Sequence, residues 1–234
     1  MGRTSPIVRY KKKLITSIVN SPELVELVNA DYVGGVWMSN LYYAAEYKNR
    51  IMNLLLKNKN LIKLVNPTPS ECEDLDIIDV LVGGEWFING KQYKEQGHIF
   101  DYNFVNETTT DQKTFIFVET DIDTVRDNLF TDFNLYVCIF TAKELVRLTS
   151  KTSPTVKEVK EMGYFAGSYA NRIDVLCDVV DGILNGTDKI KGIGDVEPAS
   201  RGYVTMYCPN QKYYGKCLKY KISNLNMGGD SCEN

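Results

Sequence analysis

The hydrophobic periodicity of the chain changes near Lys113, and this change constrains the fold more than any other feature. Before it, residues 10–29 and 47–66 carry apolar side chains at helical spacing, with a wide apolar stripe along each segment. After it, residues 114–122 and 133–140 are rich in the β-branched and aromatic residues that favour strands. Because each kind of element must bury its apolar side against another, helices are expected to pack on a sheet.

The remainder of the chain adds one more helix and two more strands. Apolar residues at 3.6-residue spacing predict a helix over residues 169–184, and Asn185-Gly186 predicts a left-handed end to it. Strands are expected near residues 202–208 and 214–222. This order lacks the strict strand-helix alternation of a doubly wound sheet. It predicts an α+β fold in which an antiparallel or mixed β-sheet has its helices packed on one face.

A repeat lies within the first hundred residues. Residues 10–29 and 47–66 align without gaps, and each is followed by a V-G-G-x-W motif, at 33–37 and at 82–86. The paired glycines permit positive φ angles and therefore a sharp turn before each tryptophan. Two interpretations stay open: each Trp closes the end of its own helical unit, which we favour, or it anchors a neighbouring subunit.

The repeat and the polar stretches indicate how the chain is organised. We expect a single α+β domain over residues 1–225, with residues 30–97 as an inserted subregion that carries the duplicated helix and V-G-G-x-W unit. Residues 226–234 have no apolar pattern and are expected to form a flexible tail. Residues 123–132 are expected to form a polar loop, and residues 149–168 a linker.

Composition excludes several functional classes. His98 is the only histidine among 234 residues, so catalysis that depends on a histidine pair or a His-rich metal site is disfavoured. A net charge of -3 argues against a nucleic-acid-binding protein with a large basic face. We find neither a secretory signal nor an apolar stretch long enough for a membrane helix, so synthesis in the cytoplasm and no membrane contact are expected.

The six cysteines are scattered along the chain. In a reducing compartment, and in a chain large enough to fold on its core alone, they are expected to be free thiols. Cys208 and Cys217 are the closest pair and flank a predicted hairpin, but their spacing is not that of a zinc site. No cofactor is expected.

Two groups of side chains carry candidate chemistry. Glu119, Asp121 and Asp123 alternate along a predicted strand, where they would either hold Mg²⁺ in a nuclease or phosphodiesterase, or form the solvent face of a half-buried strand, which we favour. Tyrosines and lysines near the C-terminus would clamp single-stranded nucleic acid, dock on an acidic partner subunit, or form an ordinary hairpin with a lysine-bearing edge. The side chains expected at a subunit interface are Trp37, Trp86, Tyr42, Tyr43, Tyr207, Tyr213, Tyr214, Lys216 and Lys219, with contacts from a mobile loop at Asp127, Asn128 and Asp132.

The order of elements resembles the neck and tail-completion proteins of long-tailed bacteriophages, including the tail terminators. The segments that carry the resemblance are VRYKKKLITSIVNSPELVELVN, HIFDYNFVNETTTDQKTFIFVETDI, FNLYVCIFT, RIDVLCDVVDGILNG and GIGDVEPASRGYVTMYCPNQKYYGKCLKYKISN. The likeness covers residues 8–29 and about 98–225, and it includes the GIG turn at 192–194, whereas residues 30–97 depart from it.

This resemblance implies a structural virion protein rather than an enzyme. It implies a homo-oligomeric ring, commonly hexameric, that joins the head connector or stopper to the tail tube. It implies no specific binding of nucleic acid beyond contact with DNA that passes through the ring.

Overall fold

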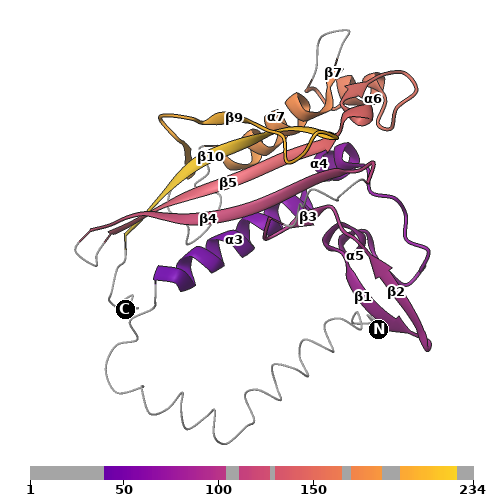
Figure 1. The fold of residues 1–234 in the computed structure, drawn as a ribbon, viewed down its shortest axis with the longest axis horizontal. Helices are drawn as coiled ribbons and strands as arrows, with labels where there is room; N and C mark the ends of the chain where they lie inside the picture. Colours follow the sequence, from indigo (N-terminus) through magenta and orange to yellow (C-terminus); the bar gives the residue numbers. More distant parts are fainter. Residues whose placement is uncertain (1–39, 104–110, 127–129, 165–169, 186–195, 226–234) are drawn as a thin grey trace, which may run out of the picture. The chain divides into compact units, whose positions relative to one another are not determined.

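Three long strands form the centre of the fold. β4 (Thr114–Arg126), β5 (Phe130–Ala142) and β10 (Tyr213–Leu225) each span 13 residues, and β5 lies between the other two with antiparallel pairing on both sides (Figure 1). The computed structural model describes residues 40–103, 111–126, 130–164, 170–185 and 196–225, which belong to one unit, Ser39–Asn226. The strands predicted at 114–122, 133–140 and 214–222 are confirmed, and each is longer than expected.

Shorter strands complete both edges of this sheet. β3 (Ile99–Phe100) pairs parallel with β4 at one edge. At the other edge, β8 (Val196–Pro198) and β9 (Val204–Tyr207) both pair antiparallel with β10. The order β3-β4-β5-β10-β8, with β9 also on β10, is a mixed sheet, as the sequence predicts.

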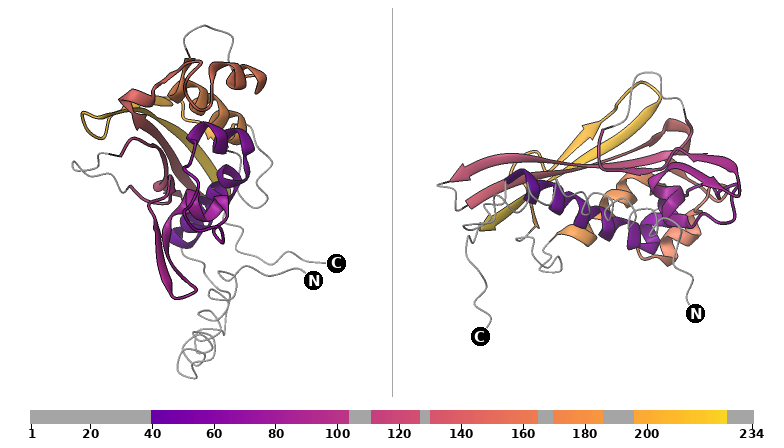
Figure 2. Two further views of the ribbon diagram at one scale, coloured as in Figure 1. Left: turned by 90° about the vertical axis from the view of Figure 1, so that its right-hand side faces the viewer. Right: turned by 90° about the horizontal axis from the view of Figure 1, so that it is seen from below.

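Helices cover one face of this sheet (Figure 2, right). α3 (Asn40–Lys57) packs on β4 and β5, and α7 (Arg172–Leu184) packs on β5 and β10. α4 (Lys59–Val65) joins the same layer through contacts with α3 and α7. The α+β fold class with helices on one face is therefore confirmed.

The helix predicted over residues 47–66 is divided in two. α3 ends at Lys57, and the Asn58 side chain accepts hydrogen bonds from the backbone N–H groups of Asn60 and Leu61, which starts α4 anew. Asparagine competes with helical hydrogen bonding in this way because its side chain mimics a backbone carbonyl. The apolar stripe survives the break, since Ile51, Leu55 and Leu61 are all buried.

Alternate residues of the long strands enter two separate buried clusters. On the helix face, Ile116 and Val118 of β4 join a large aliphatic cluster with the three helices, here called the main core. On the opposite face, Phe115 and Phe117 join a smaller one, here called the aromatic cluster. The members of the aromatic cluster are Phe100, Phe115, Phe117, Cys138, Phe140, Ala142 and Tyr213.

A two-stranded hairpin follows the helical layer. α5 (Ile77–Val82) leads into β1 (Gly84–Ile88), which pairs with β2 (Lys91–Glu95) around a tight turn at Asn89-Gly90. Both turn residues have positive φ, as expected for a type I′ hairpin turn.

Glycines allow this hairpin to join the rest of the fold. Gly83 has a φ of 73° and Gly97 a φ of 79°, and a Cβ atom added to Gly83 would lie 2.6 Å from the backbone nitrogen of Gly97. The positive φ angles expected in the second V-G-G-x-W motif are therefore present, and the two chain segments approach each other as only glycine permits.

Several boundaries differ from the sequence-based expectation. The expected linker at 149–168 contains α6 (Val156–Glu161). This helix begins with a capping box between Thr155 and Glu158. Most of the expected loop at 123–132 is strand, because β4 runs to Arg126 and β5 begins at Phe130. Asn185, the C-cap of α7, has an extended backbone, and Gly186, the other residue of the predicted left-handed end, lies outside the described residues. The remaining short elements are η1 (Lys143–Leu145), β6 (Arg147–Leu148) and β7 (Ala170–Asn171).

The first copy of the repeat, residues 10–29 with Trp37, lies outside the described residues, as do the GIG turn and residues 226–234. Among the described residues, no helix has the length and apolar character needed to cross a membrane.

Candidate interaction surfaces

The tyrosines and lysines predicted to form one C-terminal surface are divided between the two faces of the sheet. Tyr213 is fully buried in the aromatic cluster, and its hydroxyl donates to the carbonyl of Asp111 at 2.8 Å. Tyr214 faces the opposite way and packs against the main core. Adjacent residues of a strand point to opposite faces, so Tyr213 and Tyr214 do not share one surface.

The lysines of β10 follow the same alternation. Lys216 lies on the helix face, where its Nζ is 2.6 Å from a carboxylate oxygen of Asp174 on α7. Lys219 lies on the other face, with its Nζ 5.5 Å from the centre of the Tyr136 ring. Both cations have partners within the chain, Lys216 in an ion pair and Lys219 in a cation–π contact.

Tyr207 and Trp86 are half-buried. Tyr207 on β9 packs edge-on against Phe117 at the margin of the aromatic cluster. Trp86 on β1 lies opposite Tyr93, with its ring against Gly84, and belongs to neither buried cluster. Trp86 therefore packs within its own hairpin, and the choice between the two interpretations of the tryptophans stays a prediction.

The other expected contact residues are only partly described. Tyr42 and Tyr43 lie in α3, but their side chains are outside the described part of the structure. Trp37, Asp127 and Asn128 are outside it altogether. Asp132 is a strand residue of β5, opposite Thr124, and not part of a loop.

The three carboxylates proposed for metal binding are engaged separately or exposed. Glu119 lies 3.2 Å from the Nζ of Lys48 on α3. Asp123 accepts hydrogen bonds from Lys221 at 3.1 Å and from Asn134 at 3.2 Å, and these contacts lower its pKa, with Lys221 as the main cause. Within the described ranges, no group of three His, Cys, Asp or Glu side chains is placed to hold a metal ion.

A polar network that the sequence did not indicate joins α7 to the sheet. The hydroxyls of Tyr203 and Tyr220 both donate to one carboxylate oxygen of Asp181, the second over 3.1 Å. Burial and this carboxylate raise the pKa of Tyr203 to about 12, and burial raises that of Tyr220 further. The network is a structural contact, since it connects α7 to β10 and to the segment before β9.

His98 is buried beside the sheet rather than placed at a surface. Its Nδ1 donates to the carbonyl of Thr114 at 2.9 Å, and burial lowers the pKa of the imidazole. The neutral imidazole therefore makes a structural hydrogen bond, and this bond connects the segment before β3 to β4.

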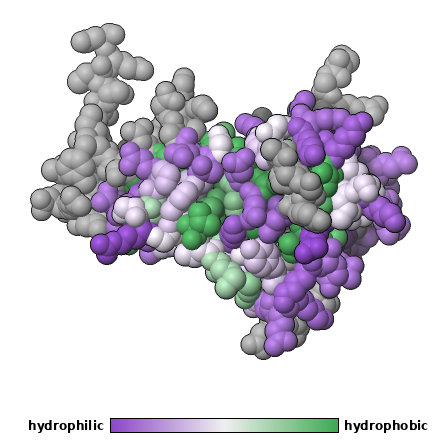
Figure 3. All heavy atoms as spheres, turned by 90° about the horizontal axis from the view of Figure 1, so that it is seen from above, coloured by the Kyte–Doolittle hydropathy of each residue, from purple (hydrophilic) through white to green (hydrophobic). Residues whose placement is uncertain are grey.

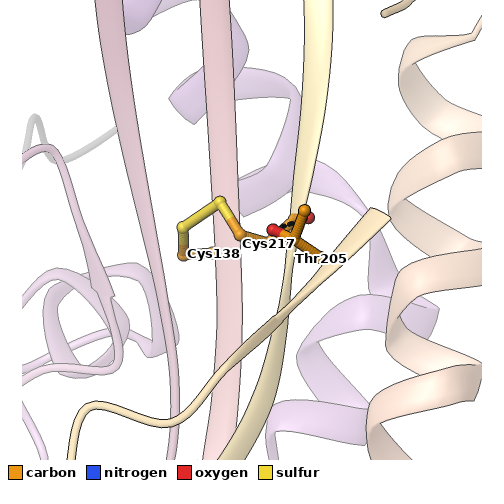
Figure 4. Close-up of a disulfide and its surroundings, with 3 residues drawn as sticks. All are labelled: Cys138, Thr205 and Cys217. Atoms are coloured by element: carbon orange, nitrogen blue, oxygen red, sulfur yellow. Dashed lines mark hydrogen bonds between the residues drawn. A yellow bond between two sulfur atoms is a disulfide. The ribbon is translucent and has the colours of Figure 1, made fainter. Parts of the chain in front are cut away.

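One disulfide contradicts the expectation of free thiols. Cys138 of β5 and Cys217 of β10 are directly opposite in the strand register and are bonded to each other (Figure 4). The sequence did not indicate this pair because the two cysteines are 79 residues apart. Cys72 and Cys177 are buried free thiols, and Cys208, the cysteine nearest to Cys217 in the sequence, is free and exposed.

Exposed apolar side chains gather in two places, at opposite edges of the sheet. One group lies on α5 and β1, and α5 contacts the edge strand β3. The other lies on β9, beyond β10 at the far edge. In Figure 3, hydrophobic residues reach the surface between hydrophilic ones on the face shown. Such groups on a folded surface are typical of contact sites. The residues are Ile77, Ile78 and Val82 on α5 at the first edge, with Phe87 on the adjoining β1 hairpin, and Val204 and Met206 at the second, while exposed Tyr102 follows β3.

Comparison with known proteins gives one match. No curated protein and no solved structure matches the chain. The model of the YomW family matches residues 50–222, from within α3 to residue 222 of β10, and thus includes α4, α5, α7 and the sheet except for the last three residues of β10. The chain belongs to the YomW family, which derives from a Bacillus phage, and it is therefore a phage-related protein.

Proposed function

We propose that this protein is a structural component of a tailed phage particle and forms a homo-oligomeric ring in the neck, where the head connector meets the tail. The observation that carries the proposal is membership of a phage-derived family. The order of elements, which resembles that of tail terminators, supports the proposed position in the neck.

The charged side chains have partners within the chain, which supports a role in assembly rather than in catalysis. Glu119 and Asp123 pair with lysines, and Asp181 accepts from two tyrosines. Each of these groups holds elements of the fold together. The apolar residues exposed at both sheet edges are instead free to contact other molecules, as a subunit of an assembly requires.

Measurement of particle mass tests this proposal. Purified protein is examined over a range of concentrations by size-exclusion chromatography with light scattering and by negative-stain microscopy. Closed rings, together with detection of the protein in purified phage particles by mass spectrometry, are the expected result. A protein that is monomeric at every concentration and absent from particles would overturn the proposal.

A further inference from the structure

The two edges of the sheet carry opposite charge as well as exposed apolar residues. From residue 66 to residue 90 the chain has six carboxylates and no lysine or arginine. From residue 198 to residue 225 it has five lysines and arginines and no carboxylate. The first segment contains α5 and β1, and the second contains β9 and β10. The lysines of β10 have partners within the chain, so exposed Arg201 and Lys212 supply the charge at the second edge.

The first surface, here called the acidic edge, surrounds α5. Ile77, Ile78 and Val82 are each more than two-fifths exposed. The carboxylates of Glu71, Glu73, Asp74 and Asp76 lie on exposed residues just before and at the start of this helix. The acidic edge is therefore an apolar surface bordered by negative charge.

The second surface, here called the basic edge, consists of β9 and its flanks. Met206 is 76% exposed and Val204 45%, and exposed Arg201 and Lys212 stand before and after the strand. β9 itself, Val-Thr-Met-Tyr, has no charged residue and no proline, and its register with β10 has no bulge, so nothing in the strand prevents pairing with another chain. Of the nearby carboxylates on α7, Asp174 is paired with Lys216 and Asp181 with the two tyrosines, whereas Asp178 is exposed.

We infer that the acidic edge of one copy binds the basic edge of the next copy. The two surfaces are opposite in charge, each has an apolar centre, and they lie at opposite edges of one sheet. Contact between two different surfaces of identical copies is heterologous, so every added copy offers a free edge to the following one until rotation closes a ring. This inference rests on the proposed function and assigns the surfaces through which the ring forms.

Charge reversal on either edge tests the pairing. The Glu73→Lys/Asp74→Lys variant and the Arg201→Glu/Lys212→Glu variant are each expected to assemble only at a concentration about tenfold or more above wild type, because like charges then face each other. A mixture of the two variants is expected to assemble again, since each reversed edge meets a reversed partner. Lys157→Glu/Lys160→Glu on α6, an equal charge change on exposed residues away from both edges, is the control and is expected to leave assembly unchanged.

Crosslinking through an existing thiol tests the geometry independently. Cys208 is exposed and directly follows β9, so Ile78→Cys places a second thiol on the acidic edge. Under mild oxidation this variant is expected to give a ladder of covalent oligomers, and Ile78→Cys/Cys208→Ser is expected to lose the ladder. Dimers without a ladder would show contact between like edges and overturn the inference.

The outcomes separate this inference from the function it rests on. Rings that form normally despite both charge reversals would overturn the edge-to-edge contact and leave the ring itself intact. A monomeric wild-type protein that is absent from phage particles would overturn both.

Discussion

Arg172 is a buried cation whose side chain donates hydrogen bonds to backbone carbonyls. It is 1% exposed, and its guanidinium donates to the carbonyls of Leu145, Leu64 and Ser153 over 3.0, 2.6 and 2.8 Å. Burial lowers its pKa to about 10, so the group stays charged at neutral pH. Leu64 lies in the last turn of α4, where carbonyls carry the negative end of the helix dipole. One side chain thus joins three separate segments.

Replacement of this side chain should destabilise the whole unit. Arg172→Met keeps the apolar stem and removes the donors, which leaves three carbonyls without the hydrogen bonds they accept now. We expect the free energy of unfolding to fall by about 3 kcal/mol or more. Urea unfolding followed by circular dichroism measures this, with Arg147→Met at an exposed position as the control. A loss equal to that of the control would contradict the prediction.

His98 should give the stability a distinct dependence on pH. Burial lowers its folded-state pKa below the ordinary value of 6.5, so the unfolded state takes up the proton first as pH falls. The unfolding free energy is therefore expected to be intact above pH 6.5 and to decrease as pH falls from there towards the folded-state pKa.

Because His98 is the only histidine, one variant isolates its contribution. His98→Asn retains an N–H donor but does not titrate. Urea unfolding of both proteins at a series of pH values should show a shallower decline for the variant just below pH 6.5. Equal slopes in that interval would refute the assignment.

At the scale of elements, the β1–β2 hairpin depends on the close approach of its two ends. Gly90 and Gly97 have the same φ of 79°, but a Cβ atom on Gly90 meets nothing within 4 Å, whereas one on Gly97 would lie 2.6 Å from the carbonyl oxygen of Val82. The two positions therefore form a matched pair that separates backbone strain from steric overlap.

We expect Gly90→Ala to cost about 1 kcal/mol, from the positive φ alone. Gly97→Ala should cost about 1–3 kcal/mol more, since backbone atoms must shift to admit the methyl group. Hydrogen exchange of amides in residues 84–95, together with urea unfolding, measures both effects. Equal costs for the two substitutions would show that the overlap is relieved without penalty.

Local sequence signals predicted the type of most long elements but not their partners. β-branched and aromatic runs identified β4, β5 and β10, because such residues pack well on the surface of a sheet. The break at Asn58 was missed because the apolar stripe continues across it. Only the amide side chain marks the new helix start.

The candidate surfaces were less predictable for a physical reason. Four candidate residues are close in the sequence: Tyr213, Tyr214, Lys216 and Lys219. Side chains alternate between the two faces of a strand, so these four lie on opposite faces of the sheet. The charge segregation of residues 66–90 and 198–225 is visible in the sequence. The sequence does not show that the two segments lie at opposite edges of the sheet, because their positions follow from the strand order.

At the scale of the whole molecule, the disulfide closes a long loop. Cys138 and Cys217 bracket α7, β8 and β9, and the bond restricts 79 residues of sequence in the unfolded chain. The Cys138→Ala/Cys217→Ala variant is expected to lose about 2–5 kcal/mol of unfolding free energy relative to the oxidised protein.

Peptide mapping under non-reducing conditions establishes that the bond is present, and urea unfolding gives its contribution. Cys208→Ala, at a free exposed thiol, is the control and should unfold with the wild-type midpoint. An unchanged midpoint in the double variant would show that the crosslink adds no stability.

The two faces of β4 also explain how the strand keeps its register. At the start of β4 both faces are apolar. A shift of the register by one residue would move Phe115 and Phe117 into the positions of Ile116 and Val118, where side chains of the wrong volume but not of the wrong polarity would be buried. Farther along, the same slip would bring Glu119 and Asp121 under α3, where charge would lose its water. The carboxylates that first suggested metal chemistry thus help to fix the strand register. A register shifted by one residue would bury them, which costs free energy.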